Sequence, residues 1–132
     1  MIQIPKNIVD LIKTVPASFA TSSKIGCVNC NVVSDIRVVS PNQIIVADNF
    51  FNKTRQNLNE NSLVALVVHT TDYKNAYQLK GSAQVYTDNK HRQQLIEIFG
   101  DDPHWSKKAT VIVTVTEIWD LADPKLICSE KL

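Results

Sequence analysis

Three adjacent side chains, Lys53, Thr54 and Arg55, have the types and the spacing of an anion-binding segment. Residues 54–61 have the spacing of a short helix, and Asn52 or Thr54 would cap its first turn through a side-chain oxygen. A helix N-terminus presents unpaired amides and a partial positive charge, so it attracts anions. Lys53 would supply a point charge, Thr54 a neutral donor and Arg55 a forked donor, which together suit a phosphate. Most capped helices with a basic residue near their start bind nothing, so the segment alone leaves both interpretations open.

The composition narrows the class of protein that must position these residues. The chain has 132 residues, of which 44% are apolar and 20% charged, and we expect one domain spanning 1–132. Lys plus Arg number 14 and Asp plus Glu 13, which argues against nucleic acid or an anionic membrane as the main partner. No apolar run approaches the roughly 18 residues of a transmembrane helix. The N-terminus lacks the layout of a signal peptide, so we expect a cytoplasmic protein.

Cys27 and Cys30 form a Cys-x-x-Cys motif, which invites a zinc or redox interpretation. The three histidines are scattered rather than placed at ligand spacing, so half of a zinc site is missing. Residues 27–33 also resemble a strand, which would separate the two Cα atoms by about 10 Å and point the side chains to opposite faces. A disulfide needs Cα atoms within about 7 Å. We therefore expect no metal or disulfide at this pair, whose role stays open.

The remaining pattern predicts a mainly β fold. Helices are expected over 5–15, over 54–61 and between Asp88 and Gly100. Strands are expected over 17–22, 28–34, 36–39, 44–47, 63–68, 76–87 and 110–121, and the tail 122–132 is not assigned. Gly81 lies inside one of these strands, where a bulge or a closely approaching backbone is the usual reason for glycine. Six to seven strands with helices around them predict a small antiparallel β-barrel.

Three local signatures resemble a known family. The first is Phe19-Ala20-Thr21 in a strand that leads through a glycine turn to the strand over 27–33. The second is the lysine-threonine step at 53–54, with an Asn-Leu pair one turn later. The third is the Lys-Gly-Ser kink at 80–82 in a long strand. In this order they resemble the flavin-binding split-barrel family, the pyridoxamine 5'-phosphate oxidase-like proteins, over roughly residues 8–120. The short chain is similar to the small FMN-binding proteins of that family, which are compact homodimers.

The resemblance implies an FMN at the interface of a homodimer. Lys53 and Thr54 would hold the phosphate, and Asn29 and Asn31 would hydrogen-bond the phosphate, the ribityl chain or the ring edges. The strand end at 46–49 would pass along the isoalloxazine. The implied cofactor-binding residues are Asn29, Asn31, Ala47, Asp48, Asn49, Lys53, Thr54, Trp105 and Trp119.

The aromatic residues complete the implied site. Phe50 or Phe51 would close one side of the ring, and Trp105 and Trp119 are the candidates for an aromatic wall from the partner subunit. Core or dimer packing is the competing interpretation for both tryptophans, because an indole buries a large area. The two asparagines have a competing interpretation as edge-strand residues that face water.

The family implies a flavoprotein that acts as an oxidoreductase or an electron-transfer protein, with NAD(P)H or a redox partner protein exchanging electrons with FMN. Oxidation of pyridoxine phosphate is not expected, because the full-length oxidases bind the substrate phosphate with an Arg/His-bearing C-terminal segment. Here 122–132 offers only Lys125 and Lys131.

Two other ligands and one other role compete with the FMN oxidoreductase. The same fold could hold the deazaflavin F420 at a similar phosphate anchor. It could hold haem, for which His69, His91 and His104 are the only candidate axial ligands. It could also serve as a non-catalytic flavin carrier.

Overall fold

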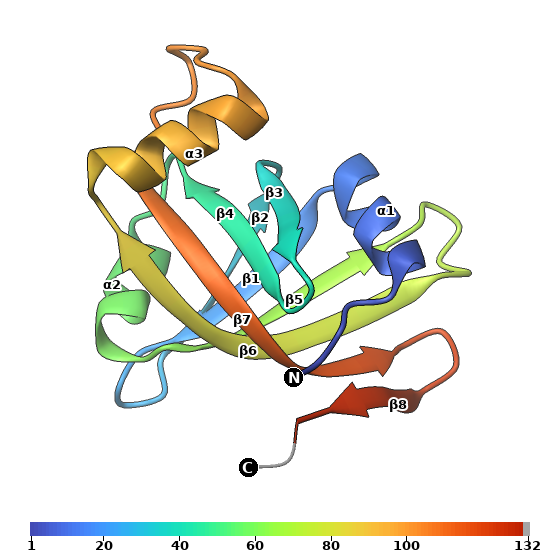
Figure 1. Cartoon of the computed structure of the whole chain (residues 1–132). Helices are drawn as coiled ribbons and strands as arrows, with labels where there is room; N and C mark the ends of the chain where they lie inside the picture. The colour runs from blue at the N-terminus through green and yellow to red at the C-terminus, as the bar shows by residue number, and fades with distance from the viewer. Residues whose placement is uncertain (131–132) are drawn as a thin grey trace.

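The structure is a computed structural model that describes residues 1–130. Its eight strands form one antiparallel sheet in the order β2-β1-β5-β6-β7-β4-β3, and β8 pairs with β7. The sheet curls into an open barrel (Figure 1), and its two end strands are joined by the link at 34–35. The predicted antiparallel split barrel is confirmed. The strands are β1 (Ala17–Ser22), β2 (Val28–Val33), β3 (Ile36–Ser40), β4 (Gln43–Asp48), β5 (Leu63–His69), β6 (Ala76–Tyr86), β7 (Ala109–Asp120) and β8 (Lys125–Ser129).

Strand β8 was not predicted, although its start carries a turn signal. The carboxylate Oδ1 of Asp120 accepts hydrogen bonds from the amides of Ala122 and Asp123, each at 3.0 Å, and Pro124 follows. The strand forms because β4 covers only the first half of β7, from Ala109 to Thr114. The second half of β7 is left with an open edge, which β8 fills.

Three helices flank the sheet: α1 (Lys6–Thr14), α2 (Lys53–Glu60) and α3 (Asn89–Phe99). Helix α1 buries Ile8 and Ile12 against the barrel, as its predicted apolar stripe requires. Helix α3 lies over the outer face of β4, where Leu95 packs against Ile45 and Ala47 (Figure 1). None of the helices in residues 1–130 is long and apolar enough to span a membrane.

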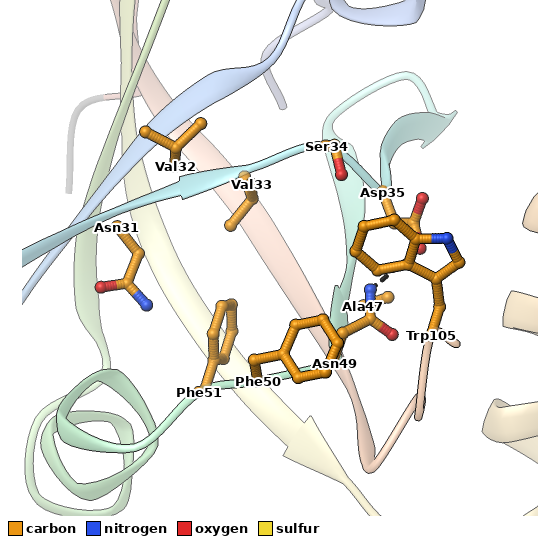
Figure 2. Close-up of a pocket in the computed structure, with 10 residues that line it drawn as sticks. All are labelled: Asn31, Val32, Val33, Ser34, Asp35, Ala47, Asn49, Phe50, Phe51 and Trp105. Carbon is orange, nitrogen blue, oxygen red and sulfur yellow. Dashed lines mark hydrogen bonds between the residues drawn. The ribbon is translucent and has the colours of Figure 1, made fainter. Parts of the chain in front are cut away.

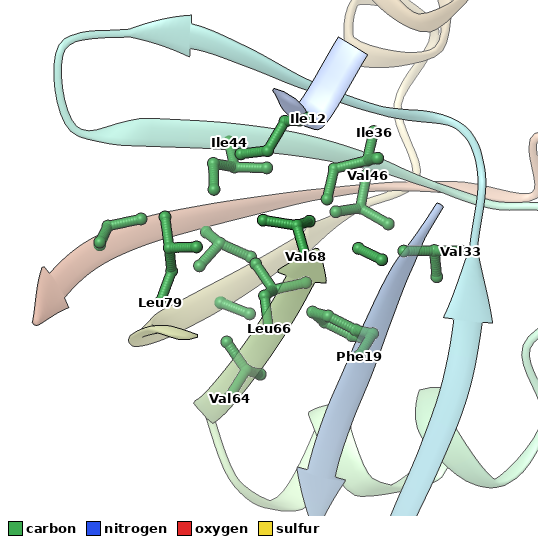
Figure 3. Packing of buried hydrophobic residues seen from close by; sticks show 14 of the residues in the cluster. Ile12, Phe19, Val33, Ile36, Ile44, Val46, Val64, Leu66, Val68 and Leu79 are labelled. Atoms are coloured by element: carbon green, nitrogen blue, oxygen red, sulfur yellow. The ribbon is translucent and has the colours of Figure 1, made fainter. Parts of the chain in front are cut away.

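The barrel interior is filled by aliphatic side chains around Phe19 and Leu66 (Figure 3). Burial alternates along β1, so Phe19 and Thr21 point inward while their neighbours are only partly buried. Phe19 is opposite Asn31 and Thr21 is opposite Asn29 in the β1–β2 ladder. Directly paired residues share a face of the sheet, so the two asparagines of β2 lie on the inner side of this edge strand.

The prediction at Gly81 is confirmed. The pairing of β6 with β7 shifts register between Lys80 and Gly81. A Cβ atom at Gly81 would lie 2.0 Å from the carbonyl oxygen of Thr114, which leaves no room for any other residue.

Candidate functional site

Six of the nine predicted cofactor-binding residues line two neighbouring hollows, one beside the start of α2 and one between β2 and the end of β4. A cleft of about 310 Å³ is lined by residues that include Asn29, Lys53 and Gln56. A second pocket of about 90 Å³ is lined by residues that include Asn31 and Trp105 (Figure 2). Asn29 joins the two hollows, because its Nδ2 donates to Oδ1 of Asn31 at 3.1 Å.

The N-terminus of α2 has unused donors. Asn52 precedes the helix, but neither it nor Thr54 makes a side-chain cap, so that prediction was wrong. The carbonyl oxygen of Asn52 accepts the amide of Gln56, which leaves the amides of Lys53, Thr54 and Arg55 without a hydrogen bond to residues 1–130. A helix N-terminus with unpaired amides is a place where an anion can bind, although Thr54 itself is buried.

Thr54 does not cap because its side chain turns to β2 instead. It is 0% exposed, and its Oγ1 accepts a hydrogen bond from Nδ2 of Asn29 at 2.9 Å. A hydroxyl that accepts one bond still has its own proton to donate. Lys53, one residue earlier, is exposed and lines the cleft. One carboxylate, Glu60, lines the same cleft and accepts from the amide of Lys24 at 3.1 Å.

Arg55, which the sequence offered as a forked donor for a phosphate, pairs with a carboxylate of the chain. Its Nη1 lies 2.9 Å from Oδ2 of Asp48, whose side chain is 0% exposed. The other carboxylate oxygen accepts the amide of Phe51 at 3.0 Å. A buried carboxylate requires a cation and hydrogen bonds, and Asp48 obtains both from Arg55 and the amide of Phe51. Asp48 thereby anchors the loop that leads into α2.

The pocket beside this loop has an aromatic wall. Phe50 is 61% exposed, and its ring centroid lies 5.7 Å from that of Trp105. Phe51 also lines the pocket, but it is 7% exposed and its ring stacks on Phe19 in the core, with ring centroids 6.0 Å apart. Of the two phenylalanines, Phe50 therefore presents the larger surface to a ligand. Ala47 also lines the pocket, although its side chain belongs to the cluster under α3.

Trp119 lies far from these residues within one chain. Strand β7 begins at Ala109 beside Asp48 and runs away from it, and Trp119 is near its other end. There its Nε1 donates to Oε2 of Glu117 at 2.5 Å. The two tryptophans are thus separated, and only Trp105 borders the pocket.

The three histidines differ in their surroundings. His69 bonds the carbonyl oxygen of Thr70, and His91 bonds the carboxylate of Asp88. His104 instead lies against Phe50 and Trp105, with ring centroids 6.3 Å and 4.9 Å away. Of the three, it is the one beside the pocket.

The cysteine motif does not form a metal site in the part of the chain that the structure describes. Cys27 and Cys30 are free and exposed, and no group of three or more His, Cys, Asp or Glu side chains gathers at metal-binding distance within residues 1–130. Cys27 lines the cleft next to Lys53. Cys30 is opposite Ala20 in the ladder and faces outward, since it alternates with the two inward asparagines.

The fold is a split β-barrel, and an unpaired helix N-terminus lies beside an aromatic pocket at its edge. The sequence model described as pyridoxamine 5'-phosphate oxidase matches residues 4–122. Because this match covers most of the sequence, the chain belongs to the pyridoxamine 5'-phosphate oxidase family. The family resemblance predicted from the three signatures is confirmed.

A curated relative and several solved structures are similar to the chain. The uncharacterized protein MJ0282 of Methanocaldococcus jannaschii is 35% identical over 106 residues, which span 77% of this chain and 70% of the relative. HupZ of Group A Streptococcus superposes with a TM-score of 0.83 at 20% identity, over 95% of this chain and 99% of that one.

Two further structures have names that refer to flavin-type cofactors. An FMN-binding protein of Syntrophomonas wolfei has a TM-score of 0.76 at 15% identity, over 91% of this chain and 90% of that one. An F420 reductase has a TM-score of 0.67 at 15% identity, over 87% of this chain and 98% of that one. At these identities the likeness establishes the fold alone.

Proposed function

We propose that this protein binds FMN, with the phosphate at the N-terminus of α2. The observation that carries the proposal is the set of donors there. Three amides lack a partner within residues 1–130, Thr54 keeps a hydroxyl proton, and Lys53 supplies a positive charge at the cleft. Asn29 holds the Thr54 hydroxyl in place and has its own amide oxygen left to accept. This donor set fits a phosphate monoester.

The ring of the cofactor would then lie toward the second pocket. Asn31 and Asn49 line that pocket, and Phe50 and Trp105 provide its aromatic wall. Ala47 and Asp48 end the strand that runs alongside, and the Asp48 side chain would act by holding the loop. We propose a homodimer in which Trp119 of the partner subunit, rather than that of the same chain, approaches the ring.

When it is bound, FMN supplies hydride or electron transfer, and the protein supplies binding and orientation. We therefore propose an oxidoreductase or electron-transfer protein that exchanges electrons with NAD(P)H or a redox partner protein. Pyridoxine phosphate oxidation is not proposed. The tail at 122–130 forms a hairpin with β7, and Lys125 pairs with Asp123 at 3.3 Å. Lys131 lies outside the described residues.

The alternatives use the same residues. F420 carries a phosphate that would suit the same donors. Haem would need an axial ligand, and His104 is the histidine placed beside the pocket. A flavin carrier without turnover would bind FMN in the same way but would not consume NAD(P)H with an artificial acceptor.

Titration of the protein with FMN and with riboflavin, followed by flavin fluorescence, tests the proposal. Riboflavin lacks the phosphate, so Lys53→Ala and Thr54→Val are expected to weaken FMN binding by about tenfold or more each and leave riboflavin affinity nearly unchanged. Lys13→Ala removes an equal charge from the exposed end of α1 and serves as the matched control. Equal losses for both ligands, or no binding of FMN by the unaltered protein, would refute the proposed phosphate site.

A further inference from the structure

Asn49 is the point where three separate segments of the chain meet. It is 7% exposed and begins the loop between β4 and α2. Its Nδ2 donates to Oδ2 of Asp35, in the link between β2 and β3, at 3.0 Å (Figure 2). Its Oδ1 accepts the amide of Lys107, in the segment between α3 and β7, at 2.9 Å. Its carbonyl oxygen also accepts the hydroxyl of Ser106.

The contact with Lys107 holds an unusual backbone conformation. Lys107 has a φ angle of 46°, in the left-handed region that residues with a side chain rarely adopt. It is 1% exposed, so solvent does not support this conformation. A strained residue persists where surrounding contacts fix it, and the amide bond to Asn49 is one such contact. The segment that carries Trp105 therefore depends on Asn49 for its course.

The two aromatic side chains of the pocket are direct neighbours of this junction. Phe50 follows Asn49 in the chain, and Trp105 precedes Lys107 by two residues. The rings of Phe50 and Trp105 lie 5.7 Å apart, and both line the pocket with Asp35. A displacement of any of the three segments would thus separate the two rings.

We infer that Asn49 is a positioning residue that fixes the Phe50–Trp105 wall of the pocket, and that it does not act as a hydrogen-bonding ligand of the cofactor ring. Both ends of its side chain already have protein partners. The role in cofactor binding rests on the proposed function, because the wall matters to affinity only if a flavin ring lies against it.

The hydrogen-bond polarity at this junction makes the inference testable. Asp35 is a carboxylate, so it can only accept, and the side chain opposite must donate. Asn49→Asp keeps the acceptor for Lys107 but places two carboxylates about 3 Å apart, where like charges repel. Adding Asp35→Asn restores one donor and one acceptor with the direction of the bond reversed.

The first readout needs no flavin. In a Trp119→Phe background, the fluorescence of Trp105 reports its own exposure. Asn49→Asp is expected to increase acrylamide quenching of Trp105, and the combination with Asp35→Asn is expected to return it to the starting value. If acrylamide quenches Trp105 equally in all three variants, or if adding Asp35→Asn does not return the quenching to its starting value, the positioning role is overturned. This result stands whether or not the protein binds FMN.

The second readout separates positioning from phosphate binding. Asn49→Asp is expected to weaken the binding of riboflavin and the binding of FMN by the same factor, about tenfold, because the phosphate donors on α2 are unchanged. Adding Asp35→Asn is expected to restore the affinity for both flavins. If Asn49 itself contacts the flavin ring, the affinity for both flavins will stay low in the combined variant, and that outcome overturns the inference. Far-ultraviolet circular dichroism verifies that each variant is folded. The combined variant, which keeps the hydrogen bond, is the test that remains if Asn49→Asp alone fails to fold.

Discussion

The guanidinium of Arg55 lies 2.9 Å from the buried carboxylate of Asp48, seven residues earlier in the chain. The other oxygen of this carboxylate, Oδ1, accepts the amide of Phe51, and Nζ of Lys108 lies 3.9 Å from the same Oδ1 while donating to the carbonyl oxygen of Phe51. One acidic side chain therefore fixes the loop from the end of β4 to the start of α2. The orientation of the free amides on α2 depends on this loop.

Replacing Asp48 should destabilise the protein. Asp48→Asn keeps the shape of the side chain at position 48 but removes its charge. Arg55, which is 27% exposed, is then left without this counter-charge. Removing one partner of a buried ion pair is costly, and with Arg55 partly solvated we expect a loss of about 2–3 kcal/mol in the free energy of unfolding. Urea unfolding followed by circular dichroism measures it. The matched control is Asp10→Asn, which breaks the exposed pair with Lys6 and should cost about 0.5 kcal/mol or less. Similar losses in the two variants would contradict the anchoring role.

The close backbone approach at Gly81 makes a second prediction about stability. Gly81→Ala would put a Cβ atom 2.0 Å from the carbonyl oxygen of Thr114, so β6 and β7 must separate or lose their register. We expect a loss of about 3 kcal/mol or more, or a failure to fold.

Gly26→Ala provides the comparison for this prediction. Gly26 has a φ angle of 90° with open space around it, so alanine there meets only backbone strain, at a cost of about 1 kcal/mol. Thermal unfolding of the two variants side by side measures the difference. If Gly81→Ala destabilises the protein no more than Gly26→Ala does, the backbone at the bulge can shift to accommodate a side chain, and the prediction is wrong.

Much of the fold could be predicted from local patterns. The apolar runs of β4 and β5 indicated strands without knowledge of their partners, and Gly81 indicated the bulge. The lysine-threonine step indicated the start of α2, because helix-terminal chemistry is local. These features depend on residues within a few positions of one another.

The parts that could not be predicted depend on residues far apart in the sequence. Asn49 is 14 positions from Asp35 and 58 from Lys107, and no local pattern marks these contacts. Arg55 looked free because its partner Asp48 had been assigned to a strand beside the cofactor. The strand β8 did carry a local signal, the Asp120 turn, but its existence depends on how far β4 extends along β7.

The start of α3 predicts a pH dependence of stability. Asp88 caps this helix, accepting both the amide and the ring Nδ1 of His91 at 3.1 Å and 2.8 Å. The bond from the His91 side chain holds the pKa of Asp88 below its ordinary value of 3.8. A carboxyl whose pKa is lower in the folded state stabilises the protein above its unfolded pKa and loses this contribution as the pH falls through its folded pKa.

Comparison with Asp88→Asn isolates that contribution, because asparagine also caps helices but carries no charge. Above about pH 4 the unaltered protein should be the more stable of the two, and the difference should shrink as the pH falls from about 4 to about 2. Urea unfolding midpoints measured over this range give the answer. A difference that stays constant down to about pH 2 would show that the charge of Asp88 does not stabilise α3.

The cysteines offer a direct chemical probe of where the phosphate lies. Cys27 and Cys30 are exposed, whereas burial raises the pKa of the Cys128 thiol, so iodoacetamide should modify Cys128 last. Cys27 lines the cleft with Lys53, while Cys30 faces outward from β2. We expect saturating FMN to slow the alkylation of Cys27 by about tenfold, as measured by peptide mass spectrometry. The alkylation rate of Cys30 should stay within about twofold of its rate without FMN. Riboflavin, which lacks the phosphate, should protect Cys27 less at equal occupancy. If FMN protects Cys30 instead, the cofactor lies on the outer face of β2, and the cleft beside Lys53 is not its binding site.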